Sequence, residues 1–268
     1  MNWMKKVAVA LVCLLPLGLQ AAKVDTLQVK SPSMNKSIEV VVVSPDVAAT
    51  KACPVIYLLH GYGGNARTWV GIKPDLSKIA DEKGIFFVCP DGKNTWYWDS
   101  PLNADVRYET FISDELVKYV DSHYKTVADR KGRAITGLSM GGHGAMWNGL
   151  RHSDVFSAAG STSGGVDIRP FPKNWEMSVQ IGEKAKYPEN WEKYTVINLV
   201  PTLRKDQIAL IFDCGDSDFF LEVNKNYHEA LLKQGIDHDF ITRPGNHDSQ
   251  YWNTVSYTHL TLPTICSV

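Results

Sequence analysis

Short apolar runs that end in turn residues alternate with helix-like segments along most of this sequence. The apolar runs occupy residues 37–45, 53–61, 84–92, 133–139, 155–164, 207–215 and 237–245. Runs of this kind, closed by Gly, Pro, Asp or Ser, are typical of strands in a mostly parallel sheet that is covered on both faces. Residues 110–124 and 218–235 repeat their apolar side chains at helical spacing. The alternation predicts an α/β domain with three layers.

The length of 268 residues and the hydrophobic content of 44% suit one large domain with a substantial core. In a parallel sheet of this class, binding and catalytic sites lie beyond the carboxyl ends of the strands. Polar residues and glycines gather at those ends, in the segments "HGYGG", "PDGKNTWYW", "GLSMGG", "DCGDSDFF" and "PGNHD". Residues 166–202 contain no long apolar run, and we expect them to form an excursion between two strands that caps the site.

Charge and cysteine content argue against several classes of ligand. The formal net charge is −1 and the basic residues are dispersed, which is unlike the basic footprint of a nucleic-acid binder. Cys53, Cys89 and Cys214 sit against apolar runs, and no Cys or His spacing suggests a metal site. We therefore expect structural cysteines, with no bound metal and no cofactor.

The N-terminal 22 residues read as a secretion signal. Lys5 and Lys6 precede an apolar run over residues 7–19, and the small residues Ala21 and Ala22 follow it. The run is too short to span a bilayer comfortably, so we expect cleavage rather than a membrane anchor. This predicts a secreted or periplasmic protein without stable membrane association, whose mature domain covers residues 23–254.

The C-terminal segment begins "VSYTHLTLPT" at Val255 and reads like a translated transposon-based sequencing adapter. We expect residues 255–268 to be a read-through tail that replaces the native C-terminus.

Ser139 lies in the segment "AITGLSMGGHGAMW", between a strand run and a helical continuation. The pattern Gly-x-Ser-x-Gly is weak evidence alone, but a strand–turn–helix context is what a nucleophile elbow requires. Gly137, Gly141 and Gly142 would permit the sharp turn and the close approach of helix to strand. The context predicts that Ser139 is a catalytic nucleophile.

A serine nucleophile needs a base and an acid, and in this fold they follow it in the order acid, then histidine. His247 alone lies in a glycine-containing loop after the last strand, where an imidazole can reach the elbow. Asp213, Asp216 and Asp218 all follow or end the strand run "IALIF", and spacing does not choose among them. Asp218 precedes a helix and would serve equally as its N-cap.

The oxyanion of an acyl-transfer reaction needs N–H donors. We expect one from Met140, which follows the nucleophile, and one from Tyr62 in the loop "HGYGG". His60 closes a strand and precedes Ser139 in the chain, so we expect it to have a structural role.

Taken together, "LLHGYGG", "PDGKNTWYWDSP", "RYETFISDEL", "AITGLSMGGHGA", "DCGDSDFF" and "PGNHDSQYW" resemble motifs of the esterase-D-like group of α/β-hydrolases. That group includes S-formylglutathione hydrolases, tributyrin-type acetylesterases, feruloyl esterases and secreted mycolyltransferases. The resemblance runs from about Leu27 to Trp252 and implies the α/β-hydrolase fold. It also implies that Asp218 is the acid, and it supports His247, Tyr62 and Met140 in the roles above. The family continues into a last helix after "HDSQYW", and we expect that helix to be missing here.

These features predict a secreted serine carboxylester hydrolase acting on feruloyl or acetyl esters of plant polysaccharides. We expect Trp96 and Trp98, near a strand end, to bind substrate, and Trp175 and Trp191 to form either an aromatic wall or lid packing. The alternatives are a general short-chain acyl esterase or an S-formylglutathione-hydrolase-like thioesterase. A carbohydrate-binding protein that retains the elbow without catalysis is the non-enzymatic alternative.

Overall fold

The computed structural model of the chain describes residues 22–260. The predicted signal over residues 1–22 therefore lies outside the described residues except for Ala22. Of the predicted tail over residues 255–268, only residues 255–260 are described, and all but the last of these belong to the final helix.

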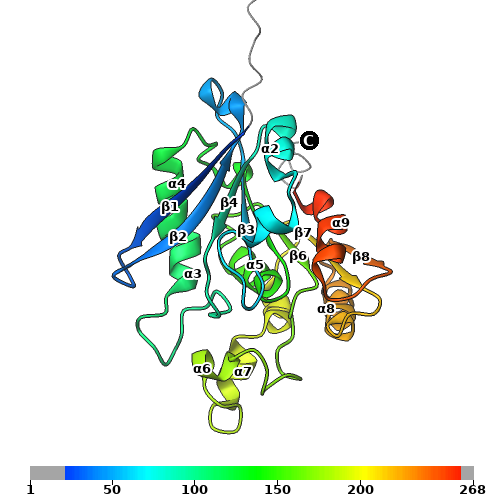
Figure 1. Cartoon of the computed structure of the whole chain (residues 1–268). Coiled ribbons are helices and arrows are strands. Elements are labelled where there is room, and N and C mark those ends of the chain that lie inside the picture. The colour runs from blue at the N-terminus through cyan, green and yellow to red at the C-terminus, as the bar shows by residue number, and fades with distance from the viewer. Residues whose placement is uncertain (1–21, 261–268) are drawn as a thin grey trace, which may run out of the picture.

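Within the described residues, eight strands form one sheet in the order β1-β2-β4-β3-β5-β6-β7-β8 (Figure 1). The strands are β1 (Lys23–Ser31), β2 (Lys36–Ser44), β3 (Val55–Leu59), β4 (Phe86–Pro90), β5 (Arg133–Gly137), β6 (Ala158–Thr162), β7 (Ala209–Gly215) and β8 (Asp239–Arg243). β1 pairs with β2, and β2 with β4, in antiparallel register, whereas the pairings from β4 across to β8 are parallel. The predicted mostly parallel sheet is confirmed.

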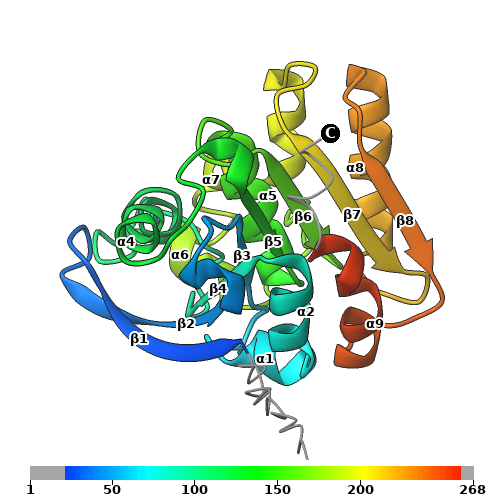
Figure 2. The same ribbon diagram turned by 90° about the horizontal axis from the view of Figure 1, so that it is seen from above.

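Helices cover both faces of this sheet. They are α1 (Thr68–Ile72), α2 (Leu76–Lys83), α3 (Tyr108–Thr110), α4 (Leu116–His123), α5 (Met140–Arg151), α6 (Met177–Ile181), α7 (Pro188–Lys193), α8 (Leu221–Gln234) and α9 (Ser249–His259). Shorter turns are η1 (Asp46–Ala49), η2 (Phe111–Glu115, a π-helical turn that joins α3 to α4), η3 (Arg130–Gly132) and η4 (Val196–Thr202). α4, α5 and α8 lie on one face, and α1, α2 and α9 lie on the other (Figure 2).

The apolar runs are continuous because both faces of each central strand are buried. In β2, Val40 and Val42 belong to the core under α4 and α5, while Val41 and Val43 belong to the core under α1 and α2. All four side chains are fully buried, because alternate residues of a strand point to opposite faces. This two-sided burial accounts for the three layers.

The predicted absence of a last helix is wrong for this structure, because residues 249–259 form α9. The Asp248 carboxylate caps α9 by accepting a hydrogen bond from the Tyr251 N–H at 2.9 Å. Val255, Ser256 and His259 are buried against the sheet, so side chains from the suspected tail complete this helix. That residues 255–268 are a read-through tail stays a prediction.

Residues 166–202 leave the sheet after β6 and return at β7, and they contain α6, α7 and η4. The Ile197 N–H donates to the Val166 carbonyl at 3.0 Å, which joins the two ends of this capping excursion. α6 and α7 lie away from the sheet at the bottom of Figure 1. No helix within residues 22–260 combines the length and apolar character that crossing a bilayer requires.

Candidate active site

Ser139 occupies a sharp turn between β5 and α5. Its backbone angles are φ 54° and ψ −119°, a conformation that a non-glycine residue adopts only when its surroundings enforce it. A Cβ atom on Gly137 would lie 2.3 Å from the Gly141 carbonyl oxygen, and one on Gly141 would lie 2.2 Å from the Leu59 carbonyl oxygen. The two glycines therefore allow α5 to pack directly on β5 and β3, and the predicted strand–turn–helix geometry is confirmed.

The serine hydroxyl begins a chain of two hydrogen bonds. Ser139 Oγ lies 2.8 Å from His247 Nε2, and His247 Nδ1 lies 2.8 Å from Asp218 Oδ2. Because the carboxylate can only accept from Nδ1–H, Nε2 of the neutral ring is left to accept the serine proton. The Asp218 carboxylate is fully buried, while 15% of the His247 side chain is exposed. This arrangement can abstract a proton from the hydroxyl and hold the resulting imidazolium beside a negative charge.

The other two aspartates near β7 have different partners. Asp213 Oδ2 pairs with His259 Nε2 at 2.5 Å in the interior of the protein. Asp216 Oδ1 accepts from the Gly245 N–H at 3.3 Å, at the base of the loop that carries His247. Asp218 is held by the turn before α8, where its Oδ1 accepts from the Phe220 N–H at 2.8 Å. Of the three, Asp218 is the one that contacts His247.

His247 is enclosed by aromatic rings from two segments. Its ring centroid lies 4.3 Å from that of Phe219 and 5.0 Å from that of Trp252, which meets it edge-on. Phe219 follows Asp218 in sequence, so one short segment supplies both the carboxylate and a packing surface. These contacts restrict the imidazole to orientations that face Ser139.

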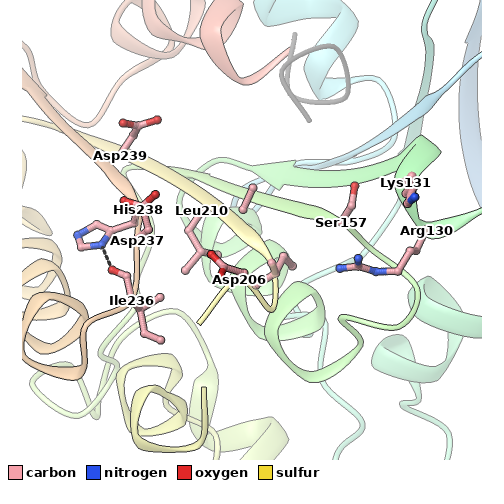
Figure 3. A pocket seen from close by; sticks show the side chains of 11 residues that line it. Arg130, Lys131, Ser157, Asp206, Leu210, Ile236, Asp237, His238 and Asp239 are labelled. Carbon is pink, nitrogen blue, oxygen red and sulfur yellow. Dashed lines mark hydrogen bonds between the residues drawn. The ribbon is translucent and has the colours of Figure 1, made fainter. Parts of the chain in front are cut away.

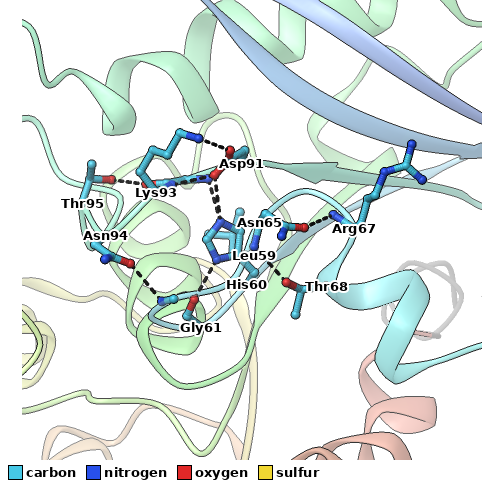
Figure 4. Close-up of polar contacts among 12 residues, drawn as sticks. Leu59, His60, Gly61, Asn65, Arg67, Thr68, Asp91, Lys93, Asn94 and Thr95 are labelled. Atoms are coloured by element: carbon cyan, nitrogen blue, oxygen red, sulfur yellow. Dashed lines mark hydrogen bonds and ion pairs between the residues drawn. The ribbon is translucent and has the colours of Figure 1, made fainter.

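The loop after β3 is fixed from behind by His60. The buried His60 ring donates from Nδ1 to the Gly61 carbonyl at 2.7 Å and accepts at Nε2 from the Gly92 N–H at 2.9 Å (Figure 4). The predicted structural role of His60 is confirmed. Asp91 lies beside the ring. Burial acts to raise the carboxyl pKa of Asp91, but the neighbouring His60 ring and the hydrogen bonds and charge of Lys93 outweigh burial and lower that pKa.

Met140 and Tyr62 present their amides near this turn. Met140 is the first residue of α5, so its N–H has no partner within the helix. Within residues 22–260, neither the Met140 nor the Tyr62 N–H donates a hydrogen bond to another protein group. Both amides are therefore available for an oxyanion.

A pocket of about 320 Å³ opens over Ser139 and His247. Its aromatic lining comes from Tyr62, Trp175, Phe219 and Trp252. Trp175 reaches it from the capping excursion and stacks on Phe219 with ring centroids 5.6 Å apart. Of the two tryptophans considered in the excursion, Trp175 forms part of the aromatic wall of this pocket, whereas Trp191 is fully buried.

The structure places Trp96 and Trp98 behind this wall and not in the pocket. They are 1% and 0% exposed and stack on each other at 5.6 Å. Trp96 Nε1 donates to the Trp175 carbonyl at 3.2 Å, and Trp98 Nε1 donates to His143 Nε2 at 2.9 Å. The expectation of direct substrate contact is wrong for this structure, because both indoles are buried, hydrogen-bond to groups inside the protein and do not line the pocket.

A larger pocket, of about 820 Å³, lies at the opposite ends of the strands from Ser139 (Figure 3). Arg130, Ser157 and His238, which line it, immediately precede or lie close before β5, β6 and β8. It therefore faces the amino ends of the strands, whereas Ser139 lies at the carboxyl ends. Its size does not make it the reactive site.

The remaining reactive side chains offer no competing chemistry among the described residues. No group of three or more His, Cys, Asp or Glu side chains within residues 22–260 is arranged to hold a metal ion. Cys53, Cys89 and Cys214 are buried and unpaired, and burial raises the thiol pKa of all three. A thiol that stays protonated is a poor nucleophile.

Comparison with known proteins gives a consistent assignment. A family model described as "Putative esterase" matches residues 31–255. Acetyl esterase from Caldicellulosiruptor saccharolyticus is 26% identical over 216 residues, which cover 74% of this chain and 78% of that protein. S-formylglutathione hydrolase from Rattus norvegicus is 22% identical over 250 residues, which cover 78% of this chain and 87% of that protein.

Among solved structures, a ferulic acid esterase superposes with a TM-score of 0.78 at 29% identity, over 92% of this chain and 100% of the other. This agrees with the three-layer fold and its mostly parallel sheet. Because the family model spans most of the sequence, the chain belongs to the Esterase family of α/β-hydrolase fold, whose members named above identify it as a carboxylester hydrolase.

Proposed function

We propose that this esterase is a secreted serine hydrolase that cleaves feruloyl or acetyl esters of plant polysaccharides. In this proposal Ser139 is the nucleophile, His247 the general base and Asp218 the carboxylate that orients it. The observation that carries the proposal is the continuous chain of hydrogen bonds from Asp218 through His247 to Ser139, 2.8 Å at each step, beneath an aromatic pocket.

The reaction proceeds in two halves. Ser139 Oγ attacks the ester carbonyl carbon while its proton passes to His247 Nε2, and the carbonyl oxygen becomes an oxyanion that accepts from the Met140 and Tyr62 amides. The tetrahedral intermediate collapses, the C–O bond to the alcohol breaks, and His247 returns the proton to the leaving oxygen. Water, deprotonated by the same imidazole, then cleaves the acyl-enzyme and releases the acid.

The lining of the pocket favours an aromatic acyl group. Tyr62, Trp175, Phe219 and Trp252 present rings on several sides of the space over Ser139, and aromatic groups gain from stacked or edge-on contact with such rings. A feruloyl group has a planar ring that these side chains can contact, whereas an acetyl group would leave most of the aromatic lining uncovered. The similarity to a ferulic acid esterase supports the same choice.

Export supports the polysaccharide part of the proposal. The segment with Lys5 and Lys6 before an apolar run is of the secretory kind, and plant polysaccharides are encountered outside the cell. An S-formylglutathione thioesterase is the second candidate, favoured by the similarity to the rat enzyme. A cytosolic substrate of that kind fits poorly with export.

Covalent labelling and acyl-ester kinetics test the proposal together. A fluorophosphonate should label the wild-type protein at Ser139, because only an activated serine reacts, and Ser139→Ala should abolish both labelling and hydrolysis of a nitrophenyl acetate. Methyl ferulate should be turned over with a higher kcat/KM than acetylated xylan. A Ser139→Ala protein that keeps most of its activity contradicts the triad, and S-formylglutathione as the preferred substrate contradicts the polysaccharide assignment.

A further inference from the structure

Glu176 of the capping excursion is connected to the loop after β3 through Asn94 of the loop after β4. Glu176 Oε2 accepts a hydrogen bond from Asn94 Nδ2 at 3.3 Å, and Asn94 Oδ1 in turn accepts from the Gly63 N–H at 2.9 Å. Figure 4 shows Asn94 beside the loop after β3. Desolvation and the adjacent Glu176 carboxylate raise the pKa of the Tyr62 phenol. Glu176 is thus linked through Asn94 to the amide of Gly63, the residue after Tyr62, and its carboxylate lies beside the Tyr62 phenol.

The backbone around Glu176 is held in an unfavourable conformation. Trp175 has φ 49° and Glu176 has φ 53°, so two consecutive residues with side chains occupy the left-handed region that favours glycine. Such residues persist only where several contacts fix them. The Trp175 carbonyl accepts from the buried Trp96 indole at 3.2 Å, and the Trp175 ring stacks on Phe219. On the other side of this turn, the contacts of Glu176 hold the chain.

The strained turn has a geometric result. It sends the Trp175 ring into the pocket over Ser139 and the next side chain, Glu176, toward the loop that carries the Tyr62 amide. An isolated exposed carboxylate contributes little to stability. Here the carboxylate accepts from Asn94, which holds the Gly63 amide, and it lies beside Tyr62, which lines the pocket over Ser139.

We propose that Glu176 is a positioning residue that fixes the Tyr62 amide and the Trp175 ring around Ser139, so that one side chain couples the oxyanion donor to the acyl-binding wall. This inference rests on the proposed serine-esterase function. It implies that loss of the carboxylate affects the chemical step through Tyr62 and the binding of aromatic acyl groups through Trp175.

Two substrates separate these effects. Hydrolysis of methyl ferulate and of ethyl acetate can both be followed by titration of the released acid, and only the first has an aromatic acyl group. In Glu176→Ala we expect kcat to fall about 10-fold on both esters, because the oxyanion donor is less well placed. We expect KM to rise about 3–10-fold for methyl ferulate, because ring contacts are lost, and to stay unchanged for ethyl acetate.

Conservative and matched variants distinguish positioning from a general loss of structure. Glu176→Gln keeps an oxygen that can accept from Asn94, so its kinetic constants should stay within about 3-fold of wild type. Glu189→Ala removes another exposed carboxylate of the same excursion and should leave both substrates unaffected. Tyr62→Phe removes only the phenol, and its effect should not add to that of Glu176→Ala, because both changes break the same contact.

The outcome can be separated from that of the proposed function by fluorophosphonate labelling. Wild-type protein that is not labelled at Ser139 overturns the proposed function and this inference with it. Labelled wild-type protein with a Glu176→Ala variant whose kcat and methyl ferulate KM match wild type overturns this inference alone. A Glu176→Gln variant as impaired as Glu176→Ala also overturns it, since an accepting oxygen would then be insufficient.

Discussion

At the scale of single residues, the turn that follows β7 determines which aspartate serves as the acid of the proposed triad. Asp216 and Asp218 are two positions apart, yet Asp216 accepts from the backbone of the His247 loop and Asp218 accepts from the imidazole itself. The sequence left this choice open until the family resemblance was considered. Spacing alone cannot make it, because which carboxylate faces His247 depends on how two separate loops meet.

Exchanging the Asp218 carboxylate for an amide tests its proposed role. Asn presents either an amide or a carbonyl to His247 Nδ1, so Asp218→Asn removes the negative charge beside the imidazolium and permits the wrong tautomer. We expect kcat to fall roughly 10³–10⁴-fold with little change in KM. Initial-rate kinetics on methyl ferulate measure this.

The matched control is Asp216→Asn. Its amide oxygen can still accept from Gly245, so we expect kcat within about 3-fold of wild type. Equal losses in the two variants would refute the assignment of Asp218.

The tryptophans show where residue-level prediction stops. The sequence placed aromatic side chains near a strand end, but Trp96 and Trp98 point inward while Phe219 and Trp252 line the pocket. Trp96 has a φ of 58°, a backbone conformation that no local sequence preference specifies. Phe219 had a usable signal, namely its position directly after Asp218, whereas Trp252 reaches the pocket through the packing of α9.

At the scale of elements, the close approach of α5 to β3 sets the position of the nucleophile. Gly141 lies so near the Leu59 carbonyl that a methyl group would meet it at 2.2 Å. We expect Gly141→Ala to lower the free energy of unfolding by about 1–3 kcal/mol, because helix and strand must move apart. Urea denaturation at constant m-value measures the change.

Gly71 provides the comparison within the same protein. It lies in α1, where an added methyl group would meet nothing within 4 Å, and its backbone is not in the left-handed region. Gly71→Ala should therefore be neutral or raise the free energy of unfolding by up to about 1 kcal/mol. A Gly141→Ala protein as stable as Gly71→Ala would contradict the steric explanation of the elbow.

Among the described strands, the one that the sequence failed to reveal is β1. The predicted strand runs contain β2 to β8, because these strands are continuously apolar or end in marked turns. β1 is an edge strand whose side chains are largely exposed, with Val29 and Ser31 buried near its end. Its pairing with β2 along nine residues is a property of the sheet edge and leaves little hydrophobic signal in the sequence.

At the scale of the whole molecule, a buried histidine links stability to pH. His143 follows the elbow, donates from Nδ1 to the Gly165 carbonyl at 2.9 Å and accepts at Nε2 from the Trp98 indole. Burial lowers its pKa to about 4, against an ordinary value of 6.5, so the folded protein keeps the ring neutral. The unfolded chain takes up the proton first as the pH falls, and it is stabilised by doing so.

The sign of the effect follows from this order. Above pH 6.5 both states hold a neutral ring, and between pH 6.5 and about 4 only the unfolded state is protonated, so stability declines as the pH falls. We expect the free energy of unfolding to drop by about 2 kcal/mol more between pH 7 and pH 5 in wild type than in His143→Gln. Denaturant titrations at both pH values measure it, and an imidazole NMR signal of His143 that titrates near pH 6.5 would contradict it.

Much of the architecture was predictable because strands that are buried on both faces of the sheet are continuously apolar in sequence. The candidates Ser139 and His247 followed from the same runs, since each lies beyond the carboxyl end of a strand, whereas the choice of Asp218 over Asp213 and Asp216 came from the family resemblance. The pocket was not predictable in this way. Its walls come from Trp175 and Trp252, which reach Ser139 from segments whose packing depends on the complete fold.

The hydrogen bond that joins the two ends of the capping excursion has an evolutionary consequence. The hydrogen bond from Ile197 to Val166 closes the excursion upon itself, and the excursion lies wholly between β6 and β7 in the chain. Insertions, deletions or replacements between these two residues change the wall contributed by Trp175 and leave unaltered the strands that precede Ser139, Asp218 and His247. Variation that retains Glu176 would alter the wall over Ser139 while leaving the proposed triad in place, and grafting excursions between homologues that share this carboxylate offers a direct route to new substrate ranges.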